Sequence, residues 1–195
     1  GEKQTGFSLF SFSEGMDDGD IWLQKTVSIA PEDQIGDVLV KTELAVVEAI
    51  RQNYLSILNG EMKATKQPNH PVSYCAARTP VDGEIDWNQP ANDIYNFIRA
   101  QSHPYPGAYT WIDSEKLFIW RTKLFPHSYY GLPGQVAQLV NGRACVICGD
   151  HRALLLDEIE WRGERGPSSI CIKSTKFRFP RSLRMTNAPT TIVTA

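Results

Sequence analysis

Apolar side chains recur with two different periods along this 195-residue chain. Residues 7–12 alternate apolar and polar side chains, which is typical of a half-buried strand, and residues 21–29 form a second strand-like segment. Over residues 35–58 the apolar positions return every three or four residues, which predicts one long helix that Asn59-Gly60 ends. The first part of the chain is therefore predicted to contain two strands and a helix.

The second part of the chain is predicted to be a short helix followed by strands. Ile94, Phe97 and Ile98 share one face of the helix predicted over 90–100, which the prolines of 103–107 end. The expected strands are 108–112, 117–121, 135–140, 143–148 and 153–159, with a further strand within 170–179 and a hairpin turn at Asn141-Gly142. Short strands at this spacing are typical of a small antiparallel barrel.

Composition restricts the classes of function. Apolar residues make up 42% and charged residues 22%, which favours a packed core over a disordered chain. Twenty Lys and Arg against 22 Asp and Glu leave a net charge of −2, which does not favour broad attraction to nucleic acid or anionic lipid. The sequence shows neither a membrane-spanning apolar run nor a basic-then-apolar signal pattern, so we expect a cytoplasmic protein without a membrane partner.

Four cysteines raise the question of a metal or disulfide site. Cys145 and Cys148 have the spacing of a metal knuckle, but a single pair supplies only two ligands. The pair lies in a strand-like stretch of apolar residues. A zinc site is the alternative, and we expect buried, reduced structural thiols and no metal.

Residues 15–21, Gly-Met-Asp-Asp-Gly-Asp-Ile, form an acidic loop with two glycines. This loop resembles that of the formyltransferase family, which includes methionyl-tRNA formyltransferase and the amino-sugar N-formyltransferases. Residues 78–87 resemble its junction into the C-terminal domain, residues 91–100 its short helix, and residues 103–109 the turn that opens its barrel. The motifs occur in the family's order.

The resemblance implies formyl transfer from 10-formyltetrahydrofolate to a primary amine, with Asp17 as the catalytic carboxylate. In the family an asparagine and a histidine complete the catalytic set: they stabilise the oxyanion, while the carboxylate orients the histidine or accepts a proton. That pair precedes the acidic loop, yet residues 1–16 contain neither Asn nor His, and Asn69-His70 is adjacent rather than spaced. We therefore expect a C-terminal portion, inactive alone, that needs a missing N-terminal half or a second subunit.

The acidic loop can also be interpreted from its residue types alone, without the resemblance to a family. Asp17, Asp18 and Asp20 are typical of turns in which carboxylates cap neighbouring amides. The loop lacks the alternating ligands and distant glutamate of a calcium site. With the flanking motifs included, we interpret Asp17 as a catalytic residue.

Three residues of the second part are predicted to bind substrate. Arg99 is placed to hold a phosphate, although a solvated arginine at a helix end is the alternative. Tyr105 and Tyr109 are predicted to stack on a base or line a pocket, although aromatic residues beside Pro-Gly turns also serve packing.

The predicted substrate is a nucleotide-linked amino sugar. Basic residues cluster only near the end of the chain, at Lys173, Lys176, Arg178, Arg181 and Arg184, whereas a tRNA-binding enzyme usually presents a basic face. Methionyl-tRNA is the alternative substrate. A different class remains open: a non-catalytic OB-like barrel that binds nucleic acid through Trp111, Phe118 and Trp120, or that acts as a homodimer contact.

The predicted fold class is α+β. Residues 1–67 are expected to form the C-terminal part of a Rossmann-like formyltransferase domain, 68–83 a linker, 84–165 a small antiparallel OB-like β-barrel, and 166–195 a C-terminal extension. Two strands and one helix are too few for a doubly wound sheet. We expect its exposed strand edge to require another segment or subunit, so the isolated chain should associate or be poorly stable.

Overall fold

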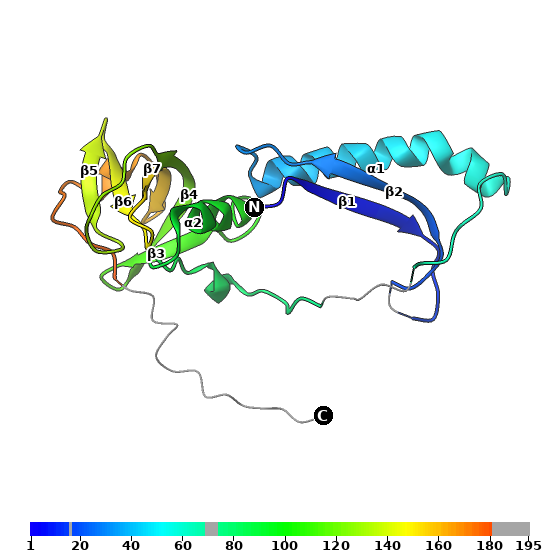
Figure 1. The fold of residues 1–195 in the computed structure, drawn as a ribbon, viewed down its shortest axis with the longest axis horizontal. Coiled ribbons are helices and arrows are strands. Elements are labelled where there is room, and N and C mark those ends of the chain that lie inside the picture. The colour runs from blue at the N-terminus through cyan, green and yellow to red at the C-terminus, as the bar shows by residue number, and fades with distance from the viewer. Residues whose placement is uncertain (16, 69–73, 181–195) are drawn as a thin grey trace, which may run out of the picture. The chain divides into compact units, whose positions relative to one another are not determined.

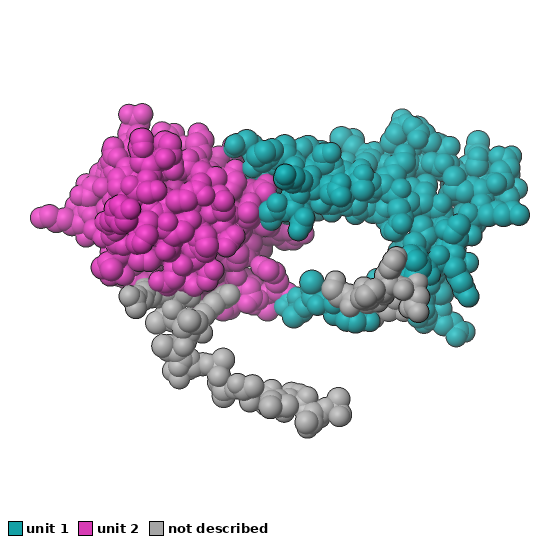
Figure 2. Space-filling view, in the orientation of Figure 1, with its two compact units in different colours: residues 1–77 teal, residues 78–195 magenta. Residues whose placement is uncertain are grey.

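The computed structural model describes residues 1–15, 17–68 and 74–180, and the chain divides into two compact units, residues 1–77 and 78–195 (Figure 1, Figure 2). Each unit has its own sheet, and this mixed arrangement confirms the α+β class. The predicted domain boundaries stay predictions. Within the described ranges, no helix is both long and apolar enough to cross a membrane.

The first unit consists of a strand pair and one helix. β1 (Gln4–Phe10) and β2 (Ile21–Ser28) pair antiparallel, with Gln4 opposite Ser28 and Leu9 opposite Leu23. α1 (Ile35–Leu58) has the predicted bounds and runs alongside the strands (Figure 1). It begins where the Asp37 carboxylate accepts the Gln34 backbone N–H at 2.9 Å, and it ends at Asn59, after which Gly60 has a φ of 71°.

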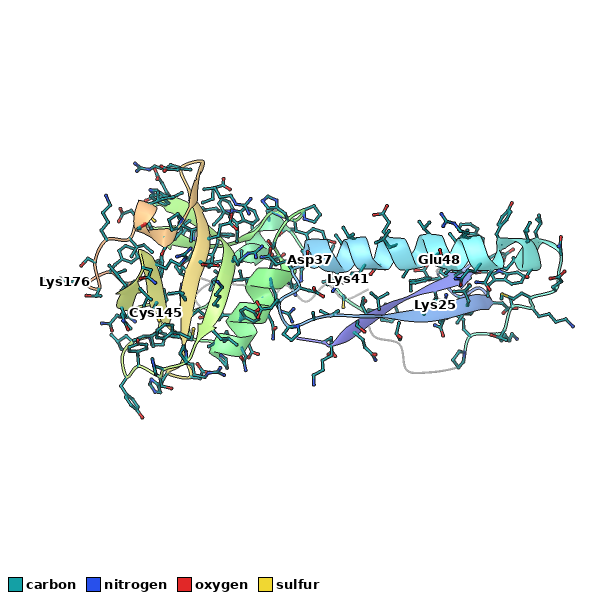
Figure 3. The ribbon with its side chains drawn as sticks, turned by 90° about the horizontal axis from the view of Figure 1, so that it is seen from above. Lys25, Asp37, Lys41, Glu48, Cys145 and Lys176 are labelled. Carbon is teal, nitrogen blue, oxygen red and sulfur yellow. The ribbon has the colours of Figure 1, made fainter. Side chains whose placement is uncertain are left out.

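One side of this unit leaves apolar surface exposed. Ala49 is the only fully buried residue described in α1. Lys25 of β2 donates a hydrogen bond to Gln52 Oε1 of the helix at 3.5 Å. In Figure 3 the labels of Lys25 and Glu48 mark the strand pair and the helix. The exposed apolar residues of α1 are Leu39, Val40, Leu44, Val47, Ile50, Tyr54, Leu55 and Leu58. Among the described residues, β1 has no second partner strand. An apolar helix face of this extent is typical of an interaction surface.

The second unit contains a six-stranded antiparallel sheet. Its path runs β3 (Ala108–Ile112), β4 (Glu115–Phe125), β7 (Ala153–Trp161), β6 (Arg143–Ile147) and β5 (Val136–Val140), and β8 (Glu164–Gly166) pairs with β7. The hairpin at Asn141-Gly142 is confirmed, because both residues have positive φ, 49° and 73°. The described pairs leave β3 and β5 at the ends of an open path, so a closed barrel stays a prediction.

The strand predicted within 170–179 is wrong. Ser168–Ile170 is a 3-10 helix, and the following residues contribute to the sheet only an isolated bridge between Gln135 and Arg178. Ile172 and Phe179 are nevertheless buried in the core. The apolar pattern here reflects packing against the sheet rather than pairing within it, since both environments bury apolar side chains. Arg181 and Arg184, assigned to the basic cluster, lie outside the described residues, as do Asn69-His70.

The core of the second unit forms between α2 (Ala91–Ala100) and the sheet. Ile94 and Ile98 of α2 are buried as predicted, and Asp150 caps the helix by accepting the Ala91 N–H at 3.1 Å. Trp87 is 1% exposed and stacks on Phe179, with 5.2 Å between ring centroids. Its indole N–H donates to Thr110 Oγ1 at 3.2 Å, so the polar end of this large core residue is satisfied.

Cys145 and Cys148 are buried thiols, whereas Cys171 is half-buried. Burial raises the pKa of Cys145 and of Cys148 to about 12, and that of Cys171 to about 11. All four cysteines are free and Cys75 is exposed; within the described part of the chain, no group of three metal-ligating side chains occurs. Figure 3 shows Cys145 inside the second unit.

We expect a maleimide reagent at pH 8 to modify Cys75 alone in the folded chain. Burial closes Cys145 and Cys148 to the reagent, and the raised pKa values of these two thiols, about 12, and of the half-buried Cys171, about 11, keep all three protonated at that pH. Mass spectrometry should show one adduct on the native chain, none on Cys75→Ser, and further adducts only in denaturant. Rapid native labelling of Cys145 or Cys148 would contradict the buried assignment.

Candidate functional site

The acidic loop that contains Asp17 joins β1 to β2 and is closed at its base. The Ser11 N–H donates to Asp20 O at 2.9 Å, and Ile21 and Thr65 exchange two backbone hydrogen bonds of 2.7 and 2.9 Å. Gly19 is buried against this base, where an added Cβ would lie 1.8 Å from Ser11 O. Only glycine allows this close approach of the two ends of the loop.

A single side chain holds the middle of the loop. The Gln67 amide nitrogen donates to Asp17 O at 2.7 Å and to Gly19 O at 2.8 Å. Asp17 has a φ of 55°, a left-handed conformation that aspartate tolerates better than most residues. The amide therefore fixes the backbone on both sides of Asp18.

The carboxylate of Asp17 differs from its neighbour in its contacts. The Asp17 side chain is exposed and makes no hydrogen bond or ion pair with residues that the structure describes. The Asp18 carboxylate, by contrast, accepts a hydrogen bond from Ser13 Oγ. Within the described part of the loop, a held backbone thus presents one unpaired carboxylate, which is the arrangement needed to orient a histidine or accept a proton.

The three residues predicted to bind substrate lie in the second unit, whereas Asp17 lies in the first. Arg99, in the last turn of α2, donates through Nε to Asn96 Oδ1 at 2.9 Å, and its guanidinium lies 5.6 Å from the centroid of the Tyr95 ring. Tyr105 is 47% exposed and its backbone N–H donates to Ser102 O at 3.0 Å. Tyr105 is therefore accessible at the surface, whereas Arg99 is half-buried at the end of α2.

Tyr109 occupies a packed position. It is 2% exposed, its hydroxyl donates to Val81 O at 3.2 Å, and Lys116 Nζ lies 3.9 Å from its ring centroid. These contacts match the packing alternative for this residue. Its predicted role in substrate binding stays a prediction.

The aromatic residues considered for nucleic-acid binding are largely covered. Trp120 is 5% exposed, donates its indole N–H to Glu160 Oε2 at 3.0 Å, and stacks with His103 at 4.0 Å between centroids. Phe118 and Trp111 are half-buried on the same strand pair. Stacking platforms for single strands need open ring faces, and Trp120 offers its face to His103 instead.

Thr65 and Gln67 were missed by the sequence reasoning, which placed no candidate residue between the predicted helix and the linker at 68–83. That stretch is polar and aperiodic, so no local pattern marks either residue. Their contacts reach loop residues more than forty positions earlier in the chain. A groove of about 670 Å³ follows the strand pair, lined by Gly6, Phe7, Ser8, Gln24, Lys25 and Thr26, and it does not include Asp17.

Comparison with known proteins identifies the family. Residues 78–168 match the family described as formyl transferase, C-terminal domain. Over 165 residues the chain is 33% identical to methionyl-tRNA formyltransferase from Symbiobacterium thermophilum, an alignment that covers 84% of this chain and 50% of that relative. Residues 78–168 therefore form a domain of the formyltransferase family. The whole chain spans about half the length of the Symbiobacterium thermophilum relative.

Solved structures of two other proteins show a similar fold. HypX from Aquifex aeolicus, in complex with tetrahydrofolic acid, superposes with a TM-score of 0.65 at 21% identity, covering 87% of this chain and 30% of that one. The N-formyltransferase from Helicobacter canadensis, with folinic acid and dTDP-3-aminofucose, gives 0.63 at 19% identity, covering 80% and 56%. At these identities the likeness concerns the fold alone.

Proposed function

We propose that this chain is the C-terminal part of a 10-formyltetrahydrofolate-dependent N-formyltransferase and that Asp17 is its catalytic carboxylate. The observation that carries the proposal is the contrast within the acidic loop: the Asp17 backbone is held by Gln67, while its carboxylate has no partner among the described residues. A structural turn former would use that carboxylate to cap a neighbouring amide. The formyl donor is supported by the folates named in the structures of HypX and of the Helicobacter canadensis enzyme.

Asp17 would act together with an asparagine and a histidine from other residues. The nucleophilic amine must lose a proton as the tetrahedral intermediate forms and collapses, and a histidine oriented by a carboxylate can accept that proton. Hydrogen-bond donors would stabilise the oxyanion. Residues 1–16 contain neither Asn nor His, and the exposed apolar face of α1 offers a surface for a further segment or subunit.

The favoured acceptor is the primary amine of a nucleotide-linked amino sugar. Support comes from the dTDP-3-aminofucose named in the Helicobacter canadensis structure and from the net charge of −2, which does not suit a tRNA-binding surface. Methionyl-tRNA is a second candidate because the Symbiobacterium thermophilum relative, 33% identical, is a methionyl-tRNA formyltransferase. Arg99 and Tyr105 are the candidates for contacts to the nucleotide.

The test is a chimera in which the part of the Helicobacter canadensis enzyme that this chain does not cover is fused to the N-terminus of Gly1. With 10-formyltetrahydrofolate and dTDP-3-aminofucose, we expect turnover by the chimera and none by the 195 residues alone. Asp17→Asn should lower kcat at least roughly 100-fold, since a general base contributes about 10²–10⁴-fold. Initiator methionyl-tRNA serves as the competing acceptor.

Asp18→Asn is the matched control. It removes the same charge one position away, from a carboxylate that Ser13 already occupies, and should change kcat by less than about threefold. Equal losses in the two variants would contradict the assignment of Asp17. Turnover by the 195 residues alone would contradict the need for a separate Asn and His.

A further inference from the structure

We propose that Gln67 is the positioning residue of the acidic loop: its side-chain amide holds the backbone that presents the Asp17 carboxylate. This inference rests on the proposed function of Asp17. The two amide contacts, 2.7 Å to Asp17 O and 2.8 Å to Gly19 O, both come from the same nitrogen. Gln67 acts through the loop backbone and touches no reacting group.

The chemistry of glutamine suits this position. A primary amide nitrogen carries two N–H groups, so one nitrogen can donate to two carbonyl oxygens at once. The carbonyls of Asp17 and Gly19 must then turn toward the same point, which bends the backbone around Asp18. An aspartate at φ 55° costs conformational energy unless surrounding contacts hold it. Gln67 supplies that contact.

Backbone hydrogen bonds of the segment that follows α1 place Gln67 next to the acidic loop. After α1, the backbone N–H groups of Glu61 and Met62 both donate to Ser56 O, at 2.9 and 3.0 Å. Thr65 then forms its reciprocal bridge with Ile21, the first residue of β2. Gln67 follows two residues later, opposite the loop that Ile21 ends. The segment from 61 to 68 is therefore part of the site and not only a connection.

Hydrogen bonds hold the two ends and the middle of the acidic loop. The Asp17 carboxylate, to which we assign the catalytic role, has no side-chain partner among the described residues. The Ser11–Asp20 hydrogen bond closes the base of the loop, and Gly19 allows this close approach because it has no Cβ. Gln67 holds the middle of the loop. Held backbone geometry is what keeps a catalytic side chain within a productive range of positions. Loss of the amide should let the carboxylate sample other directions while the unit stays folded.

The experiment measures carboxylate presentation directly on the 195-residue chain. Carbodiimide coupling to an amine, followed by fragment mass spectrometry, gives separate labelling rates for Asp17 and Asp18. In the wild type we expect Asp17 to be labelled about threefold faster than Asp18 or more, because the Asp18 carboxylate accepts a hydrogen bond from Ser13. In Gln67→Met, which keeps the side-chain length without a donor, and in Gln67→Glu, which replaces the donor by an acceptor, this ratio should fall to about one.

Gln4→Glu is the control for the charge change, since Gln4 is an exposed residue at the start of β1 and should leave the ratio as in the wild type. An unchanged ratio in both Gln67 variants would overturn the proposal. Loss of the melting transition in both would also overturn it, because Gln67 would then be required for folding rather than for positioning. The labelling ratio needs no catalysis, so its outcome is separate from the test of Asp17.

A second readout uses the active chimera. A positioning role predicts that Gln67→Met lowers kcat about tenfold or more with little change in KM, and that Gln4→Glu changes neither. A fall in the labelling ratio with an unchanged kcat would overturn the link to catalysis. If the chimera also proved insensitive to Asp17→Asn, the proposed function itself would fail, while the labelling result would still report on the loop.

Discussion

Gly19→Ala is expected to lower the free energy of unfolding of the first unit by about 2–3 kcal/mol and to release the acidic loop from Gln67. The new Cβ would lie 1.8 Å from Ser11 O and 2.8 Å from Ser11 C, both backbone atoms that no side-chain rotation can move away. The loop ends must therefore separate, which breaks the Ser11–Asp20 hydrogen bond and displaces Gly19 O from the Gln67 amide. Amide hydrogen exchange of peptides from β1 and β2 measures this loss.

Gly60→Ala is the matched control for this prediction. At Gly60 an added Cβ meets no atom within 4 Å, and the cost comes only from its φ of 71°, about 1 kcal/mol. It should leave exchange in the acidic loop unchanged. If Gly19→Ala behaved like Gly60→Ala, the close packing of the loop against Ser11 would be disproved, and with it the basis for holding Asp17 in place.

Trp87→Ala is expected to destabilise the second unit by about 3–5 kcal/mol, enough to unfold a large share of a marginally stable domain. The indole is 1% exposed and stacks on Phe179, so its removal leaves a large cavity that the sheet cannot close. It also leaves the Thr110 hydroxyl without the indole N–H that donates to it. Urea unfolding followed by near-ultraviolet circular dichroism measures the effect.

Two controls separate the ring from its hydrogen bond and from general effects of alanine. Trp87→Phe keeps an aromatic ring in the core and should cost about 1–2 kcal/mol. Tyr130→Ala removes a ring that is 92% exposed and should change stability by less than about 0.5 kcal/mol. A loss for Trp87→Ala no larger than that of Tyr130→Ala would show that Trp87 does not anchor this core.

Elements with strong local signals could be predicted with accurate bounds. α1 runs from Ile35 to Leu58 as its periodic apolar residues indicated, because helix formation depends on contacts within one or two turns. The Asn141-Gly142 turn formed because these two residues accept positive φ, which the turn requires. The family was likewise recognisable from the order of four short motifs, each of them local in the chain.

Contacts between distant residues could not be predicted in this way. Burial of Phe179 against Trp87 reproduces the apolar pattern of a strand without any strand being present. The hydrogen bonds from Gln67 to the acidic loop join residues about fifty positions apart, and neither residue type nor spacing predicts them. The motif named Asp17 as the carboxylate, but only the folded loop shows that, among the described residues, Asp18 has a side-chain partner and Asp17 has none. Local patterns indicate which side chains are buried and where the backbone turns. The contacts that hold these residues depend on chain segments that meet only after folding.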